Sequence, residues 1–430
     1  MKRIRASITP LAVVVAALAV AACGSSSSSS ASSSSQSSAA ASSSATSSAP
    51  ATGSASSSSS SGAATGSPIK IGVAIDFSAL MAPTDDPALY GAEIEASKIN
   101  AAGGVNGHPI KFMVENTQLK PAQTRSDALN LVSKGANILW VTCDVDFSTP
   151  SIEVGLQAKL LTVSPCIGTD QMGPKRFGSE GQLAYSFGNV AQDEGAADAQ
   201  IAIKQGWKTA DVITDKQIVY NQDVCQAFIS KFKALGGKVD MTASWTQGDH
   251  TIGNIANQVD GTHPAVIQVC TTGAPDISTF LSDIRSAGNS TPMLAPWSLD
   301  GTWWMPKNPK VATNVWTDSY ASIYGDDPNP QVRAMIAKLT AEGHAPTTGG
   351  FVTGAAAIDG IVAALKQDGG SLSGAKLAAA MQSFHNLPTL SGNVSFSATQ
   401  HSVFGRDYRV LEVVNGKGSF KYLINSSGGR

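Results

Sequence analysis

The sequence predicts an α/β fold with two Rossmann-like, doubly wound lobes. From Pro68 onward, short apolar segments of strand length alternate with longer segments of helical period, and this alternation occurs in two successive series. Strands that alternate with helices form parallel sheets with helices on both faces. Two such series in a chain of 430 residues indicate two lobes, because one hydrophobic core of this size would be unusually large.

The first series begins directly after Pro68. Its expected strands are short aliphatic runs at 69–75, 109–114, 137–141, 160–163 and 183–187. Its expected helices have one apolar side and lie at 90–102, 121–134 and 150–158. Gly103 and Gly104 suit a left-handed C-cap of the first helix, and the pair Asn106 and Gly107 is typical of a tight turn.

The second series repeats the pattern and is followed by a different ending. Its expected strands lie at 211–214, 238–243, 265–269, 292–295 and 314–317, and its clearest helices at 223–235 and 276–287. Three later helices are expected at 331–342, 354–366 and 374–384, before an antiparallel pair at 408–414 and 420–424. Ligands of open parallel sheets bind beyond the carboxyl ends of the strands, so two facing lobes are expected to share one cleft.

The N-terminus has the pattern of an export signal. Lys2, Arg3 and Arg5 precede an unbroken apolar run at 11–22, which is too short to span a membrane as a mature helix. Small residues stand directly before Cys23, in a stretch that resembles a bacterial lipobox. We therefore expect a signal peptide at 1–22 and lipidation of Cys23; an ordinary cleavage site with an incidental cysteine is the alternative.

The segment after Cys23 is composed almost entirely of Ser, Ala, Gly and Thr up to residue 67. Such a composition buries too little apolar surface to offset the entropy lost on ordering. A flexible coil of this length reaches roughly 35–40 Å. Residues 23–67 are therefore expected to be a lipidated cysteine and a disordered tether that holds a folded domain away from a membrane.

Composition and motifs argue against several functions. The net charge is −2 and no basic stripe is visible, so nucleic-acid binding has no support. The serines of 370–374 do not fit the G-x-S-x-G elbow of a hydrolase, and neither H-E-x-x-H nor a Walker A motif occurs. The cysteines lack the C-x₂₋₄-C spacing of zinc sites. We expect no enzyme activity, no cofactor and no metal.

Residues 91–107 resemble the helix-and-turn signature of leucine/isoleucine/valine-type, or type I periplasmic, binding proteins, which serve ABC importers. Further similar segments are 121–124, 164–165, 195–197 and 280–288. The resemblance covers about 68–424 and implies how the lobes are threaded. The N-lobe would contain 68–188 and 319–394, the C-lobe 189–318 and 395–425, and three crossings would form a hinge.

The resemblance also implies a function. It is that of a lipid-anchored binding protein at the outer face of the cell membrane, which closes on its ligand and acts as a monomer with ABC permease subunits as partners. The ligand would be a small polar molecule, namely an amino acid or an amino-acid-like or amide compound, held in the cleft by lobe closure. A ligand sensor that signals to a membrane receptor, a secreted hydrolase and a purely structural lipoprotein remain the alternatives.

The candidate binding residues follow from the family pattern. In the N-lobe they lie in the loops after the third and fourth strands: Asp144, Asp146, Phe147, Ser148, Thr149, Ser164, Cys166, Ile167, Gly168 and Thr169. In the C-lobe they are Tyr220, Thr271, Thr272, Trp297 and Asp300. Hydroxyls at Ser148, Thr149 and Thr169 are expected to bind the carboxylate of an amino acid or, alternatively, to cap helices.

The sequence departs from the amino-acid pattern at two places. Asp144 and Asp146 add negative charge where a ligand carboxylate would dock. Trp297 stands where the family has an acid that accepts the ligand's ammonium group, and Asp300 follows three residues later. An aromatic wall of Phe147, Tyr220 and Trp297 would suit an aromatic, amide-like or cationic ligand.

With Cys23 lipidated, four cysteines remain, and an even number in an exported protein suggests disulfides. Four cysteines allow three connectivities. In the implied topology, Cys143 and Cys166 follow neighbouring parallel strands, whereas Cys225 lies early in a C-lobe helix and Cys270 ends a C-lobe strand. The expected pairs are Cys143–Cys166 and Cys225–Cys270.

Overall fold

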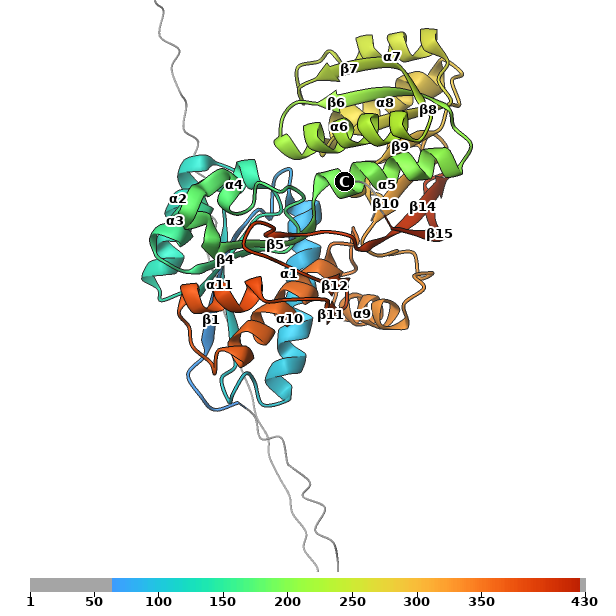
Figure 1. Cartoon of the computed structure of the whole chain (residues 1–430). Coiled ribbons are helices and arrows are strands. Elements are labelled where there is room, and N and C mark those ends of the chain that lie inside the picture. Colours follow the sequence, from blue (N-terminus) through green and yellow to red (C-terminus); the bar gives the residue numbers. More distant parts are fainter. Residues whose placement is uncertain (1–63, 426–430) are drawn as a thin grey trace, which may run out of the picture. The chain divides into compact units, whose positions relative to one another are not determined.

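The computed structural model describes residues 64–425, and its elements form two large sheets and one two-stranded sheet (Figure 1). The predicted signal peptide, Cys23 and nearly all of the tether lie outside the described residues. The mixed α/β architecture with parallel sheets confirms the predicted fold class.

The first sheet is parallel throughout, in the order β13-β5-β4-β3-β1-β2. Its strands are β1 (Ile69–Ile75), β2 (Ile110–Asn116), β3 (Ile138–Val141), β4 (Leu161–Ser164), β5 (Ala184–Asn189) and β13 (Ser402–Val403). Helices α2 (Pro121–Ser133) and α3 (Val145–Gln157) pack together on one face. Helices α1 (Ala82–Ala101), α10 (Phe351–Gln367) and α11 (Gly374–Gln382) cover the other.

The core of the first sheet explains its apolar strands. Val73 on β1 pairs with Val114 on β2 and with Trp140 on β3, and both Val73 and Trp140 are fully buried. Strands that are covered on both faces need apolar side chains at every position, which is why the expected runs are continuous rather than alternating.

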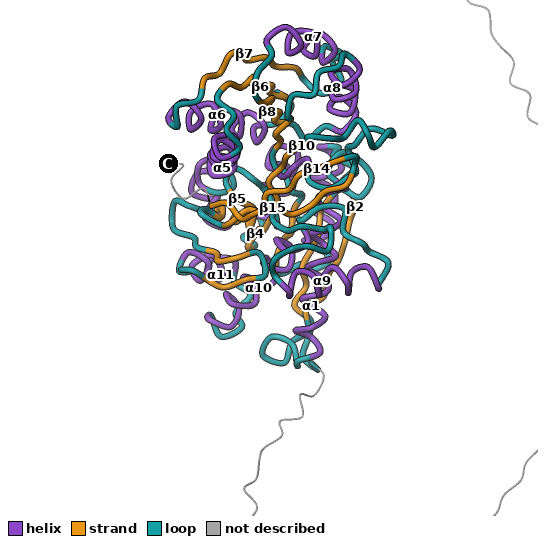
Figure 2. Tube along the Cα trace, turned by 90° about the vertical axis from the view of Figure 1, so that its right-hand side faces the viewer, coloured by secondary structure: helices purple, strands orange, loops and turns teal. Residues whose placement is uncertain are grey.

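The second sheet has the order β15-β14-β10-β9-β8-β6-β7 (Figure 2). Its last two strands along the chain are antiparallel to their neighbours. Its strands are β6 (Thr209–Asp215), β7 (Lys238–Trp245), β8 (Val266–Cys270), β9 (Met293–Ala295), β10 (Val315–Ser319), β14 (Asp407–Val414) and β15 (Lys417–Asn425). Helices α5 (Ala191–Lys204) and α6 (Val219–Ala234) lie on one face, and α7 (Ile252–Thr262) and α8 (Ala274–Ser286) pair on the other.

The smaller elements complete the chain. They are α4 (Pro174–Phe177), the 3₁₀ helices η1 (Gly178–Leu183) and η2 (Trp297–Leu299), α9 (Pro330–Ala341), and the two-stranded sheet of β11 (Leu387–Thr389) and β12 (Gly392–Val394). The short strand β13 pairs with β5, so 402–403 belong to the first sheet, although the prediction placed 395–425 in the C-lobe.

Two helices begin earlier than predicted. Helix α1 begins at Ala82 rather than at 90, and α3 begins at Val145 rather than at 150. The prediction placed the start of α3 at Pro150, a residue type that is common at the first helical position. Pro150 instead lies inside the helix, and Asp144 is the N-cap. The expected loop after the third strand is therefore largely the first turn of a helix.

The chain passes between the two sheets three times, after β5, after β10 and between β13 and β14. One residue from each crossing takes part in a buried cluster that we call the hinge clasp: Asn189, Tyr320 and Arg406. Arg406 Nε donates to Asn189 Oδ1 (2.9 Å), and the backbone N–H of Asn189 donates to Tyr320 Oη (3.0 Å). The guanidinium carbon of Arg406 lies 4.9 Å from the centroid of the Tyr320 ring.

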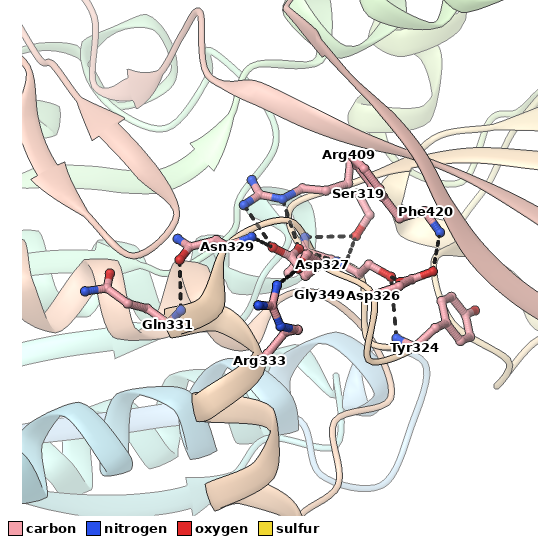
Figure 3. Close-up of polar contacts among 12 residues, drawn as sticks. Ser319, Tyr324, Asp326, Asp327, Asn329, Gln331, Arg333, Gly349, Arg409 and Phe420 are labelled. Atoms are coloured by element: carbon pink, nitrogen blue, oxygen red, sulfur yellow. Dashed lines mark hydrogen bonds and ion pairs between the residues drawn. The ribbon is translucent and has the colours of Figure 1, made fainter.

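A second polar network fixes the segment that follows β10 (Figure 3). Asp327 accepts hydrogen bonds from Arg409 Nε (3.1 Å) and from the backbone N–H groups of Ser322 and Asn329 (both 2.8 Å). Because Arg409 lies on β14, this buried ion pair ties the second crossing to the strand that follows the third.

Helices α1 and α10 approach each other closely at two glycines. A Cβ atom at Gly91 would lie 2.0 Å from the carbonyl oxygen of Phe351, and a Cβ at Gly354 would lie 1.8 Å from that of Ala88. Real Cβ atoms do not come this close, so glycine at both positions allows the two helix backbones to pack.

Candidate ligand-binding site

A small cavity lies between the carboxyl ends of the two sheets. Its lining comes from both: Met81, Thr84, Cys143, Asp144, Cys166 and Gly168 follow strands of the first sheet, and Ile218, Tyr220, Thr272, Trp297 and Ser298 follow strands of the second. The cavity volume is about 20 Å³, room for about one water molecule. An organic ligand therefore enters only when the walls move apart or side chains rotate.

The first-sheet wall contains the N-terminus of α3. Asp144 Oδ1 accepts hydrogen bonds from the backbone N–H groups of Asp146 (2.9 Å) and Phe147 (3.0 Å), so Asp144 is a side-chain N-cap. The hydroxyl of Ser148 donates to the carbonyl oxygen of Asp144, and that of Thr149 donates to Val145 O (2.7 Å). Both hydroxyls are thus engaged within the helix.

The second-sheet wall is aromatic and is held by one buried carboxylate. Glu194 Oε1 accepts a hydrogen bond from Tyr220 Oη (2.9 Å) and another from the backbone N–H of Trp297 (2.8 Å). Glu194 lies in the first turn of α5 and is fully buried. It therefore fixes the position of both aromatic residues that line the cavity.

Two polar groups of the cavity wall have no hydrogen-bond partner among the described residues. They are Thr272 Oγ1 and Trp297 Nε1. Their side chains are buried, at 7% and 3% exposure respectively. A buried polar group without a partner is costly, and one at a cavity is typical of a binding site.

The walls also touch each other directly. Asp146 Oδ2 accepts a hydrogen bond from the backbone N–H of Val219, the first residue of α6 (2.8 Å), and Asp146 Oδ1 accepts one from Arg176 (2.7 Å). A Cβ atom at Gly168 would lie 2.8 Å from the Tyr220 ring. These contacts hold the first-sheet wall against the second-sheet wall.

Several buried carboxyl groups lie in this region, and burial is the main cause of their raised pKa values. Burial raises the pKa of Asp144 to about 7 and that of Asp85 to about 8. Burial, reinforced by neighbouring carboxylates, raises the pKa of Glu194 and of Asp318 well above the usual range. At neutral pH the neutral form is therefore favoured for Asp85, Glu194 and Asp318, whereas Asp144, with a pKa of about 7, is partly ionised.

Two disulfides join the predicted cysteine pairs. Cys143 and Cys166 have a Cα–Cα distance of 4.7 Å, and Cys225 and Cys270 one of 5.8 Å. The first pair links the ends of the neighbouring strands β3 and β4 and forms part of the cavity wall. It therefore keeps the first-sheet wall rigid.

The structure brings six of the predicted binding residues to the cavity: Asp144, Cys166, Gly168, Tyr220, Thr272 and Trp297. Other candidates make contacts elsewhere: Ser164 Oγ donates to Thr142 O, Thr169 Oγ1 to Asp223, and Thr271 Oγ1 to Asp215. Asp300 Oδ2 accepts from Ser319 Oγ (2.7 Å) and Gly349 N (2.6 Å), contacts that hold the second crossing. Ile167 packs in the core of the first sheet, and the partly buried Phe147 packs against the apolar cluster that contains Tyr220 and Trp297.

Sequence reasoning missed several cavity residues: Met81, Thr84, Ile218 and Ser298. It also missed Glu194, which lies behind the aromatic wall. Met81 and Thr84 follow β1, whose carboxyl end reaches the same edge of the sheet as that of β3. The loop after the first strand could therefore have been predicted from the sequence to line the cavity, because ligands bind beyond the carboxyl ends of parallel strands.

The described residues give no indication of a metal or of a membrane span. In residues 64–425, no group of three or more His, Cys, Asp or Glu side chains is arranged to hold a metal ion. No helix in that part of the chain is both long and apolar enough to cross a bilayer.

The chain belongs to the periplasmic binding protein family, whose model matches residues 68–418. An amino acid binding protein of Pseudomonas aeruginosa is 25% identical over 285 residues, which cover 65% of this chain and 73% of the relative. The family consists of binding proteins rather than enzymes.

Solved structures share the type I periplasmic binding protein fold. The branched-chain amino acid transporter substrate-binding protein LivJ of Streptococcus pneumoniae, in complex with isoleucine, has a TM-score of 0.73 at 17% identity, covering 83% of this chain and 99% of its own. A solute-binding protein of an ABC transporter from R. palustris, in complex with benzoate, has a TM-score of 0.69 at 20% identity, covering 83% and 96%.

Proposed function

We propose that the protein is an extracytoplasmic solute-binding lipoprotein of an ABC importer. Its ligand is a small polar organic molecule, an amino acid or an amino-acid-like or amide compound, bound in the cavity between the two sheets. The observation that carries this proposal is the cavity wall itself, in which the buried Thr272 Oγ1 and Trp297 Nε1 have no partner among the described residues.

Binding is expected to proceed by closure. The cavity of about 20 Å³ is too small for such a ligand, whereas organic ligands occupy pockets of roughly 300–1,000 Å³. The two halves therefore separate to admit the ligand and close around it, with the three crossings as the hinge. The contact of Asp146 with Val219 favours the closed form, and the ligand shifts the population further toward it.

The similar structures support a small organic ligand. The structure of LivJ contains isoleucine, and the R. palustris protein contains benzoate. Both ligands are of a size that a cleft between two lobes encloses. The N-terminal sequence around Cys23 supports attachment to the outer face of the membrane, where the closed form would dock on permease subunits.

A thermal-melt screen of the purified, oxidised protein tests the binding function. The panel contains amino acids, short amides, polyamines, aromatic acids and sugars. A ligand at one hundred times its dissociation constant adds about 2.7 kcal/mol to the free energy of unfolding, and the melting temperature should rise by several degrees. Calorimetry then measures the stoichiometry, expected to be one; a panel without any saturable ligand would remove the basis of the proposal.

Detergent-phase partitioning tests the anchor separately. The protein expressed with its own leader should enter the detergent phase, and Cys23→Ser should remain in the aqueous phase. If both proteins partition alike, Cys23 is not the lipid attachment point, and the binding function stands without it.

A further inference from the structure

The N-terminus of α3, where an anionic ligand group would be expected to dock, is already occupied by a carboxylate of the chain itself. Asp144 Oδ1 accepts from both Asp146 N and Phe147 N. Free N–H groups at a helix N-terminus favour an anion, and here Asp144 is that anion. A ligand carboxylate would have to displace it and would meet its negative charge.

The same holds for other backbone donors of the first-sheet wall. The N–H of Cys143 donates to Asp85 Oδ1 (2.8 Å), and the N–H of Met81 donates to Asp76 Oδ2 (2.9 Å). Cys143 and Met81 both line the cavity. Three aspartates of the chain, including Asp144, thus accept the N–H groups that a carboxylate ligand would need.

The wall offers no counter-ion either. Among the described residues, the cavity lining contains neither Lys nor Arg. Arg176, the cation beside α3, is bound to Asp146 Oδ1 and Gln171 Oε1. Burying a carboxylate beside Asp144 without a cation carries a large desolvation cost.

The groups that remain free define the complementary ligand. Trp297 Nε1 is a donor only, and Thr272 Oγ1 can donate or accept. Asp144 Oδ2 receives no hydrogen bond from the part of the chain that the structure describes, and Asp144 lines the cavity at 3% exposure. Asp144 therefore has a carboxylate oxygen available for a ligand donor, and the cavity-lining Trp297 has an unpaired indole N–H available for a ligand acceptor.

We propose, on the basis of the binding function proposed above, that the site selects a neutral carboxamide without a free carboxylate. The amide NH₂ donates to Asp144 Oδ2, and the amide carbonyl accepts from Trp297 Nε1, with Thr272 Oγ1 as an adjustable partner. A carboxamide carries both functions on one carbon and adds no net charge. An alkylammonium ion satisfies Asp144 but leaves the indole N–H unpaired, because it has no acceptor.

Calorimetry on the full, oxidised chain with probes of matched shape tests the selection. Isovaleramide and isovalerate differ only in the replacement of the carboxamide by a carboxylate. Leucine carries the same isobutyl group with an amino acid head, and isoamylamine carries it with an ammonium group alone. Benzamide and benzoate repeat the comparison on an aromatic ring. We expect each amide to bind at least tenfold more tightly than its carboxylate, and isovaleramide more tightly than leucine or isoamylamine.

Asp144→Asn sharpens the test. Asparagine keeps an Oδ1 acceptor for the α3 N-cap but replaces the free carboxylate oxygen by an NH₂ donor. The preference for isovaleramide over isovalerate should therefore fall at least tenfold.

Trp297→Phe removes the indole donor and keeps the ring, so amide affinity should fall about tenfold. Asp240→Asn on β7, whose carboxylate pairs with Lys238 away from the cavity, is the matched control and should change neither value.

The outcomes separate this inference from the binding function. Tighter binding of leucine, isovalerate or benzoate than of the amides overturns the carboxamide selection and leaves the solute-binding function intact. An unchanged amide preference in Asp144→Asn, together with an unchanged amide affinity in Trp297→Phe, overturns the assignment of these two groups. Binding of neither amides nor acids overturns the selection and removes support from the binding function as well.

Discussion

Asp146, in the first turn of α3, accepts a hydrogen bond from the backbone N–H of Val219, the first residue of α6, across the gap between the two halves (2.8 Å). Ile218, the N-cap of α6, makes no side-chain cap hydrogen bond. A carboxylate of the first half therefore supplies the cap for a helix of the second.

This contact should contribute to ligand affinity. Asp146→Ala removes it together with the ion pair to Arg176, so the closed form loses about 1 kcal/mol, the typical value of one hydrogen bond. Affinity should fall about fivefold, as measured by calorimetry, and small-angle scattering should show a more open protein. Asp240→Asn is the control; equal affinity in both variants would show that the contact plays no part in closure.

Stability should fall as pH rises from about 4 to about 8. The pKa of Asp85 is raised to about 8 and that of Asp144 and Asp198 to about 7, mainly by burial. In this window the folded protein retains protons that the unfolded chain releases, so the free energy of unfolding decreases with pH, by at most about 1.4 kcal/mol per pH unit for each group. Urea denaturation at several pH values measures the free energy of unfolding. An increase of this free energy with pH between 4 and 8 would contradict the prediction.

Asp318→Asn should flatten that pH dependence. Among the described residues, neither buried oxygen of Asp318 has a hydrogen-bond partner, and Glu194, Asp198 and Asp300 face it. The amide cannot ionise and can donate to a neighbouring carboxylate, so the variant should be more stable than the wild type at pH 8. At pH 4.5 the two proteins should be nearly equal. A lower free energy of unfolding of the variant than of the wild type at pH 8 would contradict the view that the Asp318 charge destabilises the folded protein.

Removal of the Cys225–Cys270 disulfide should lower the free energy of unfolding by about 3–4 kcal/mol, because its sequence separation of 45 residues strongly restricts the unfolded chain. The double variant Cys225→Ala/Cys270→Ala is compared with the wild type by urea denaturation. Peptide mapping of the wild type provides the control, since pairs other than Cys143–Cys166 and Cys225–Cys270 would refute the assignment.

Gly91→Ala should destabilise the protein by about 1–3 kcal/mol, the usual cost of overpacking, because the new methyl group would meet Phe351 O. Gly261→Ala in α7 is the matched control, since a Cβ there meets nothing within 4 Å. The control should be neutral or slightly stabilising. Equal melting temperatures of the two variants would show that α1 and α10 can separate without cost.

The element order could be predicted from the sequence, because the buried parallel strands are continuous apolar runs and the helices between them have clear stops. The starts of α1 and α3 could not, because they depend on backbone N–H groups that donate to the carboxylates of Asp76 and Asp144. The same early start of α3 engages the hydroxyls of Ser148 and Thr149, which had been expected to bind ligand.

The second-sheet wall was predicted in part. Tyr220 and Trp297 came from the family pattern, and both line the cavity. Glu194, which holds them, could not be found, because the two acids in the first turn of α5, Asp193 and Glu194, look like ordinary partners of the helix dipole. Asp300 was chosen by its spacing from Trp297, but its partners, Ser319 and Gly349, come from segments that only the tertiary fold brings together.

The hinge clasp of Asn189, Tyr320 and Arg406 has a mechanical consequence. Three separate connections would allow sliding, twisting and shearing of the two halves. Because one residue from each connection contacts the other two, we expect the two halves to move relative to each other by rotation about a single axis. Rotation about one axis leads to the same closed conformation each time, so the closed protein would present the same outer surface with every ligand.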